Sequence, residues 1–292
     1  MERIKEALDR ARRERGNDSV WLDNGDRLNG SNRSPVLKLD EIIYTQSRVM
    51  KLSQKVLAQN RVITNQEQNR YSDVYKVLRT QVLRKLGERG ANTLAITSPG
   101  PGEGKSLTAL NLAISMAMEM DKTVLLVDAD LRNPSLHALL GLGKVPGLSD
   151  YLTSDVALSD LLIHPAIPRL VVLPAGKSIA NSTEMMSSQR MAKLVQELKT
   201  RYPSRYVLFD LPPLLNVADA SVFVPLVEAA IMVVEEGVTQ AEAAKRGAAL
   251  MPQDKLIGTV LNKVQKMEST YGYYGQTPVT GLFGRWAKAR SV

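Results

Sequence analysis

The chain has 292 residues, of which 44% are hydrophobic and 23% charged, and it contains no cysteine. This length suits one large domain with an extension or two smaller domains, and the lack of cysteine excludes disulfides and thiolate metal sites. The formal net charge is +8, and nearly all of the excess lies in residues 1–90. Because basic and acidic residues alternate there and aromatic residues are few, we interpret this region as a solvated or partner-facing surface and expect no nucleic-acid binding.

No apolar run approaches the ~18 residues that cross a bilayer, and residues 1–16 are too charged for a signal peptide. We therefore expect a cytoplasmic protein that reaches a membrane only through a partner or a surface contact. The two histidines, His137 and His164, have no partner at metal-ligand spacing, and we interpret both as structural.

The first 70 residues are predicted to form an N-terminal helical extension that is regulatory or binds a partner. Residues 2–15 have the spacing of a short amphipathic helix, and residues 16–36 are rich in Gly, Asn, Asp and Ser, which is typical of a linker. Residues 39–57 again show helical periodicity. A further helix is predicted over 71–90, ending at Gly87 or Gly90.

From residue 93 onward, short apolar runs alternate with helical segments. The strand-like runs are 93–97, 123–128, 169–174, 206–210, 229–234 and 256–262. Helical spacing is found at 106–120 and 188–202. The alternation predicts an α/β domain over residues 71–265, with a mostly parallel central sheet and helices on both faces. Residues 266–292 are predicted to be a flexible tail.

The segment TSPGPGEGKS, residues 97–106, joins the first of these runs to a helix. A strand, a glycine-rich loop and a helix that begins at Gly-Lys-Ser predict a P-loop, in which backbone N–H groups and the helix N-terminus converge on phosphate oxygens. Lys105 is expected to reach the β- and γ-phosphates and Ser106 to ligate magnesium. The strict pattern has glycine where this chain has Pro99, so a Gly/Pro turn with an unrelated lysine is the alternative. The nucleotide-binding residues expected here are Gly100, Pro101, Gly102, Glu103, Gly104, Lys105, Ser106 and Leu107.

Three aspartates follow apolar runs at the end that faces a ligand in open α/β sheets. Asp128 and Asp130 end the run TVLLVDAD, and Asp210 ends YVLFD. Carboxylates at the carboxyl ends of strands, beside a P-loop, suit magnesium and its waters. A helix cap is the alternative for any one of them, and for Asp219, in VADAS, it is at least as good an explanation as catalysis.

In their order along the chain, these motifs resemble those of the bacterial tyrosine kinases (BY-kinases). The resemblance covers roughly residues 70–275 and rests on TSPGPGEGKS, DADLRNP at 128–134, VLPAG at 172–176, FDLPP at 209–213, GTVLN at 258–262 and a C-terminal tyrosine cluster. The opening IKEALDRARRE is similar to the soluble branch tied to exopolysaccharide export and exosortase systems. The resemblance implies a P-loop NTPase-type fold that uses ATP and Mg²⁺.

The implied activity is that of a protein-tyrosine autokinase. Lys105 would stabilise the transferring phosphoryl group, Asp128 would accept the proton of the tyrosine hydroxyl, and Asp130 would support the metal shell. Ser106 and Asp210 would hold magnesium directly or through water. The implied catalytic residues are Lys105, Asp128, Asp130 and Asp210, and the implied metal site is Ser106, Asp128, Asp130 and Asp210.

Two further positions are matched by the resemblance. Asn262 stands where the family contacts adenine, with a strand-end turn residue as the alternative. Arg132 is expected to contact a phosphate or to be solvated.

The segment YGYYGQ, residues 271–276, supplies the implied phosphoacceptors Tyr271, Tyr273 and Tyr274. A tail of ~10 flexible residues spans only ~15–20 Å, which favours transfer to a neighbouring subunit. The resemblance implies such transfer within a ring-type homo-oligomer. The ring contacts would be Asp73, Lys76 and Arg79, although lysine replaces an arginine of the usual motif and is a poorer bidentate partner.

The resemblance also implies a role in exopolysaccharide polymerisation or export, with a separate inner-membrane polysaccharide co-polymerase as activator. Two other functions stay open. One is a positioning-type P-loop ATPase that switches a binding surface without phosphotransfer to protein, although Gly100 replaces the signature lysine of those ATPases. The other is a nucleotide-binding scaffold of an export complex.

Overall fold

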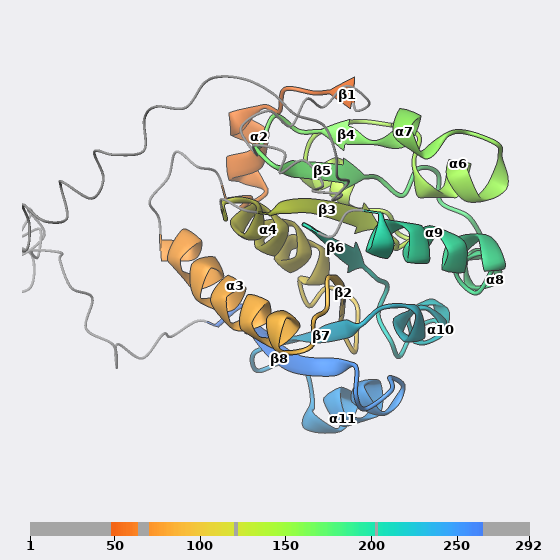
Figure 1. Ribbon diagram of the computed structural model, residues 1–292. Coiled ribbons are helices and arrows are strands. Elements are labelled where there is room, and N and C mark those ends of the chain that lie inside the picture. The colour runs from red at the N-terminus through yellow and green to blue at the C-terminus, as the bar shows by residue number, and fades with distance from the viewer. Residues whose placement is uncertain (1–47, 64–69, 120–121, 202–203, 265–292) are drawn as a thin grey trace, which may run out of the picture. The chain divides into compact units, whose positions relative to one another are not determined.

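The apolar runs of the sequence pair into one sheet. The computed structural model describes residues 48–63, 70–119, 122–201 and 204–264. Its sheet has eight strands in the order β1-β4-β5-β3-β6-β2-β7-β8 (Figure 1). The strands are β1 (Arg48–Val49), β2 (Thr93–Thr97), β3 (Thr123–Asp128), β4 (Ile163–His164), β5 (Leu170–Leu173), β6 (Arg205–Asp210), β7 (Ala229–Glu235) and β8 (Leu256–Asn262). Only the β4–β5 pair is antiparallel, which confirms the mostly parallel sheet.

Helices cover both faces of this sheet, as predicted. They are α2 (Gln54–Gln59), α3 (Arg70–Glu88), α4 (Lys105–Ala117), α5 (Leu136–Leu139), α6 (Leu148–Thr153), α7 (Leu158–Leu161), α8 (Ser182–Met186), α9 (Gln189–Thr200), α10 (Asp219–Phe223) and α11 (Ala241–Ala249), with a 3₁₀ turn η2 (Val224–Leu226). Alternate residues of β3 face two separate cores. Val124 and Leu126 join the core formed with α3 and α4, whereas Leu125 and Val127 join the core formed with α9 and α10.

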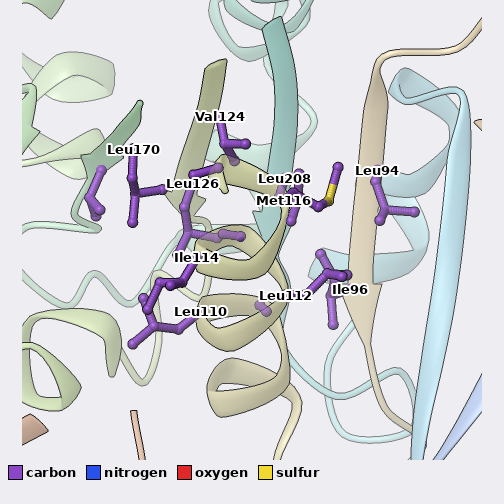
Figure 2. Packing of buried hydrophobic residues seen from close by; sticks show 14 of the residues in the cluster. Leu94, Ile96, Leu110, Leu112, Ile114, Met116, Val124, Leu126, Leu170 and Leu208 are labelled. Atoms are coloured by element: carbon purple, nitrogen blue, oxygen red, sulfur yellow. The ribbon is translucent and has the colours of Figure 1, made fainter. Parts of the chain in front are cut away.

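Helix α4 is buried on nearly all sides. Every residue from Thr108 to Ala117 is buried, which is expected of a helix held between a sheet and a second helix. Figure 2 shows leucine, isoleucine and methionine side chains of α4 pointing toward β2, β3, β5 and β6. Val82 and Leu86 of α3 complete this core from the outer side. The packing fixes the start of α4, and hence the loop before it, relative to the central strands.

The helix predicted over residues 39–57 is confirmed at residues 54–57, which lie in α2, and is wrong at residues 48–53; residues 39–47 lie outside the described residues. Arg48 and Val49 form the edge strand β1, which pairs in parallel with β4, and helix α2 begins only at Gln54. Leu57 and Ile63 are buried in the core. Residues 48–63 of the predicted extension are therefore part of the sheet and its core, because a two-residue strand is determined by its partner rather than by its own periodicity.

The other predicted elements that fall within the described residues agree with the structure. The helix predicted over residues 2–15, the linker over 16–36 and the tail over 266–292 lie outside those residues. Helix α3 ends at Glu88, between the two expected terminators, and the predicted helices at 106–120 and 188–202 correspond to α4 and α9. His164 lies in β4, where its Nδ1 accepts the backbone N–H of Ala166 at 3.1 Å, in keeping with a structural role. Among the described residues, no helix combines the length and apolar character required to cross a membrane.

Candidate active site

Three neighbouring strands bring the predicted site residues to one edge of the sheet. In the order β3-β6-β2, Asp128 ends β3 directly opposite Asp210 of β6, and Asp210 in turn lies opposite Ile96 of β2. Because these pairs are parallel, the loops that follow all three strands leave at the same edge. The structure thus places the P-loop, after β2, beside the carboxylates that end β3 and β6.

The loop between β2 and α4 has the backbone conformation of a phosphate-binding turn. Gly102 and Gly104 adopt left-handed conformations, with φ of +78° and +90°, which side-chain-bearing residues rarely adopt. A Cβ at Gly104 would also collide with the side-chain amide of Asn262. Lys105 then begins α4, so that the first N–H groups of a 13-residue helix face this loop.

The loop is braced by its own Glu103 and by two residues from distant segments, Thr239 and Asn262. Glu103 accepts the N–H of Gly100 at 3.2 Å through Oε2 and the hydroxyl of Thr239 at 2.5 Å through Oε1. Asn262, at the end of β8, donates its side-chain N–H to the Glu103 carbonyl at 2.8 Å. Glu103 and Asn262 were expected to bind nucleotide, and in this structure both brace the loop that would hold it.

The Lys105 ammonium lies between two buried carboxylates. Its Nζ is 2.8 Å from Asp130 Oδ2, 3.5 Å from Asp210 Oδ1 and 3.1 Å from the Ser106 hydroxyl. Asp128 and Asp210 are fully buried, and Asp130 is nearly so. The site therefore concentrates three carboxylates around a single ammonium group, which leaves an excess of negative charge for a cation to balance.

Burial and mutual repulsion disfavour the charged forms of these carboxylates. Burial and the charge of Asp210 raise the pKa of Asp128 to about 7. Burial also raises the pKa of Asp210, against the opposing effect of Lys105. Although burial alone would lower it, the charges of Asp210 and Asp130 raise the pKa of Lys105. Lys105 is thus firmly protonated, and Asp128 can take up a proton near neutral pH.

Asp128 also has a structural task, as the helix-cap alternative anticipates. Its Oδ2 accepts the backbone N–H groups of Ser135 and Leu136 at 3.1 and 3.0 Å, at the start of α5. Its Oδ1 accepts the N–H of Asp130 at 3.3 Å. Asp128 therefore orders the loop that presents Asp130, in addition to any part it takes in chemistry.

The oxygen atoms present fit a magnesium ion that is shared with phosphates. Asp210 Oδ2 is buried and makes no hydrogen bond within the described residues, so it is a carboxylate oxygen that lacks a partner there. Among those residues no group of three or more His, Cys, Asp or Glu side chains is arranged to hold a metal. Magnesium commonly binds through one or two carboxylates together with substrate phosphates and waters. The Asp210 carboxylate beside the P-loop fits this mode of binding.

Arg132 and Asp219 form an ion pair at the same edge. Arg132 Nε lies 3.5 Å from Asp219 Oδ2, and Asp219 Oδ1 accepts the Thr183 hydroxyl at 2.5 Å. The interpretation of Asp219 as a helix cap is wrong, because Ala218 occupies the cap and Asp219 is the first residue of α10. Its carboxylate is directed to Thr183 and Arg132 instead.

The predicted ring-contact residues lie on α3, away from the site. Asp73 and Lys76 form an exposed ion pair of 2.9 Å. Arg79 is used within the chain, since its guanidinium contacts Glu119 at 3.1 Å and donates to the Ser115 carbonyl at 2.9 Å, near the end of α4. The predicted acceptors Tyr271, Tyr273 and Tyr274 lie outside the described residues.

Thr239, Thr183 and Thr97 were not predicted as parts of the site. Thr239 binds Glu103 across 136 residues, and Thr183 binds Asp219 across 36. Thr97 donates its hydroxyl to the Pro212 carbonyl at 2.8 Å and so ties the P-loop strand to the chain after β6. Isolated threonines carry no local pattern, and only the folded chain brings these partners together.

Comparisons with known proteins agree with this geometry. A family model described as an AAA domain matches residues 91–264. Tyrosine-protein kinase YwqD of Bacillus subtilis is 37% identical over 207 residues, or 70% of this chain and 86% of that protein. Tyrosine-protein kinase CpsD of Streptococcus agalactiae is 32% identical over 206 residues, or 70% and 88%. The solved kinase domain of the Escherichia coli tyrosine kinase ETK has a TM-score of 0.65 at 27% identity and covers 79% of this chain and 93% of that one.

Proposed function

The chain belongs to the bacterial tyrosine-protein kinases, and on that premise we propose that it transfers the γ-phosphoryl group of ATP to tyrosines of its own C-terminal segment. The observation that carries the proposal is the position of the Lys105 ammonium, 2.8 Å from Asp130 and 3.5 Å from Asp210 at the head of the P-loop helix. A cation fixed at a helix N-terminus stabilises the negative charge of a phosphoryl group bound there. A neighbouring carboxylate with a pKa near 7 can accept a proton.

In the proposed reaction, a tyrosine hydroxyl oxygen bonds to the γ-phosphorus as the bond from that phosphorus to the β–γ bridging oxygen breaks. Asp128 accepts the hydroxyl proton, and ADP leaves. Lys105 and the loop N–H groups of residues 102–106 stabilise the negative charge on the phosphoryl oxygens. Lys105 would have to exchange part of its contact with Asp130 and Asp210 for phosphate oxygens.

Magnesium, when bound with ATP, would neutralise charge on the β- and γ-phosphates. Ser106 and Asp210 are the proposed residues that hold it, with Asp130 and Asp128 supporting its waters. The partnerless Oδ2 of Asp210 supports this assignment. Asn262 is proposed to face the base, since it already touches the loop on the side of β8.

The kinase assignment is tested by incubating the purified chain with Mg·ATP and measuring phosphotyrosine and free phosphate. Phosphotyrosine is expected for the unaltered chain and is expected to vanish in Asp128→Asn, because the proton acceptor is lost. Asp155→Asn, at a fully exposed carboxylate, is the control that should behave as the unaltered chain does. Free phosphate without phosphotyrosine would instead identify an ATPase switch, and the absence of both would identify a scaffold; either result overturns the proposal.

We further propose that the chain works as a ring-type homo-oligomer through α3. Besides Asp73 and Lys76, this helix exposes the apolar side chains of Tyr71, Val74 and Val77, which lie three residues apart on one face. Exposed apolar groups rimmed by charges are typical of a protein interface. Because Arg79 is bound within its own chain, the apolar residues would carry most of the contact.

Val77→Asp should therefore lower the assembly mass measured by light scattering in the presence of Mg·ATP and slow phosphotyrosine formation. Val49→Asp is a matched control, because both valines are 60% exposed and Val49 lies on the edge strand β1. An equal response of the two variants, or no response of Val77→Asp, would contradict an α3 contact.

The cellular role that we propose is regulation of exopolysaccharide polymerisation or export, at the cytoplasmic face of the inner membrane. A separate inner-membrane polysaccharide co-polymerase would act as partner and activator. Of the predicted extension over residues 1–70, the part before β1 would regulate the kinase or bind the partner, and residues 266–292 would be the acceptor tail. The family membership supports this role. An unchanged exopolysaccharide yield in cells whose only copy is kinase-inactive would contradict it.

A further inference from the structure

Asp219 is a buried carboxylate that the proposed chemistry does not use. It is fully buried, at the start of α10, and its two oxygens are directed to Thr183 and Arg132. A buried charge is costly unless it is paired and hydrogen-bonded, so its retention needs a reason. The contacts indicate that the reason is Arg132.

Two hydrogen bonds and one ion pair connect Asp219 to the guanidinium group of Arg132. Thr183 donates its hydroxyl to Asp219 Oδ1 at 2.5 Å, and the same hydroxyl accepts from Arg132 Nη2 at 3.4 Å. Asp219 Oδ2 faces Arg132 Nε at 3.5 Å, although neither of these two atoms makes a hydrogen bond within the described residues. Asp219 and Thr183 thus contact two of the three guanidinium nitrogens of Arg132, Nε and Nη2.

The backbone around Arg132 is fixed as well. Ser178 donates its hydroxyl to the Arg132 carbonyl at 2.7 Å, and Ile179 donates its N–H to the Leu131 carbonyl at 3.0 Å. The side chain of Arg132 nevertheless stays 38% exposed. A long side chain that is held at both its backbone and its head group, yet reaches solvent, has lost the freedom that a solvated arginine keeps, which is the condition for a preorganised ligand contact.

We call the set of Arg132, Asp219 and Thr183 the Arg132 clamp. Two of its residues, Arg132 and Asp219, lie in the segments that follow the proposed catalytic carboxylates. Arg132 follows Asp130 by two residues after β3, and Asp219 lies in the segment that follows Asp210 after β6. Lys105 is already shared between Asp130 and Asp210. A nucleoside triphosphate entering this negatively charged edge needs a second cation, and an arginine with one free terminal nitrogen suits phosphate oxygens.

We propose that Asp219 and Thr183 are positioning residues that hold Arg132 as the contact to the γ-phosphate of a nucleoside triphosphate. The inference rests on the proposed kinase function for its place in the reaction but not for its binding chemistry. Arg132 discriminates the triphosphate from the diphosphate, and it strengthens its contact as charge moves onto the transferring phosphoryl group. Asp219 and Thr183 never touch the substrate and act only through Arg132.

A double-mutant cycle tests whether Asp219 acts through Arg132. Arg132→Ala should weaken Mg·ATP binding about tenfold and leave Mg·ADP binding unchanged, which is the loss expected for one charge-assisted contact. Asp219→Asn should move the ratio of the two dissociation constants in the same direction by a smaller factor. The double variant should have the same ratio of dissociation constants as Arg132→Ala within about twofold, because Asp219 can have no effect through Arg132 once the Arg132 side chain is removed. Arg190→Ala is the matched control, with the same 38% exposure and a carboxylate partner, Asp155, in the loop between α6 and α7.

The cycle has clear opposite outcomes. If the fold-changes of the two single variants multiply in the double variant, Asp219 acts independently of Arg132 and the inference is overturned. It is also overturned if Arg132→Ala binds Mg·ATP and Mg·ADP as Arg190→Ala does. If Asp219→Asn fails to fold, Thr183→Val takes its place in the cycle, and Thr183→Ser, which keeps the hydroxyl, should restore the ratio. The cycle measures the dissociation constants of Mg·ATP and Mg·ADP and not phosphotyrosine. A chain that forms no phosphotyrosine would therefore contradict the kinase proposal, whereas the cycle would still show whether Asp219 and Thr183 act through Arg132.

Discussion

Replacing Lys105 by methionine should lower the rate of phosphotyrosine formation by about 10³-fold, measured as the initial rate at saturating Mg·ATP. Methionine keeps the length and much of the bulk of the lysine side chain but supplies no charge to the phosphoryl group. The second consequence concerns folding. Asp130 and Asp210 would lose their common cation inside the protein, so the free energy of unfolding of the metal-free chain should fall by about 3 kcal/mol at neutral pH.

Lys245→Met is the control for this substitution. Lys245 lies on α11, is largely exposed and pairs with Glu242 at 2.9 Å, so its loss should change neither the rate nor the stability by a measurable amount. Phosphotyrosine formation at a normal rate in Lys105→Met would remove the lysine from the mechanism. Mg²⁺ should narrow the stability difference between the variant and the unaltered chain, because a bound cation replaces part of the missing charge.

The central strands could be predicted because each is a nearly continuous apolar run. Strands buried on both faces require such runs, and Thr93–Thr97, Thr123–Asp128 and the run that ends at Asp210 all meet this condition. The order of those strands could not be read from the chain. It took the pairing of Asp128 with Asp210, 82 residues later, to show that the carboxylates are neighbours.

The features that the sequence did not reveal depend on partners far along the chain. Strand β1 consists of two exposed residues whose only signal is the strand that they pair with. Thr183 has no local pattern, and the sequence suggested Asp219 only as a helix cap or a catalytic group; it is α8 and α10 that bring both residues to Arg132. Local patterns thus predicted the groups that we propose to contact phosphate, because such groups follow one another in a loop. The groups that position them come from distant segments and need only meet in space.

Changing Tyr271, Tyr273 and Tyr274 to phenylalanine together should remove most of the phosphotyrosine while leaving Mg·ATP binding intact. The substitution removes the three hydroxyl groups that would accept phosphate and leaves every residue of the P-loop unchanged. Phosphotyrosine is measured on the whole chain and on its tail after proteolysis. Tyr151→Phe is the control, since the Tyr151 ring lies beneath the guanidinium of Arg190 at 4.8 Å and phenylalanine preserves that contact. Unchanged total phosphorylation in the triple variant would place the acceptor elsewhere.

The same triple variant decides whether transfer crosses from one subunit to another. Its catalytic edge is intact but it lacks acceptors, whereas Lys105→Met has acceptors but lacks the catalytic cation. Mixed with Mg·ATP, the two chains should together form phosphotyrosine on the Lys105→Met chain, at a rate that rises with the concentration of the triple variant. The physical reason is reach, because a flexible segment of ~10 residues, as predicted for the tail, would span only ~15–20 Å on average and would otherwise have to fold back over the sheet edge of its own chain. Three phosphorylated tyrosines would then add ~ −5 charge, which opposes renewed docking at Asp128, Asp130 and Asp210. If the mixture forms no phosphotyrosine while each parent variant behaves as described above, transfer is confined to a single chain, and the proposal of transfer between subunits of a ring is contradicted.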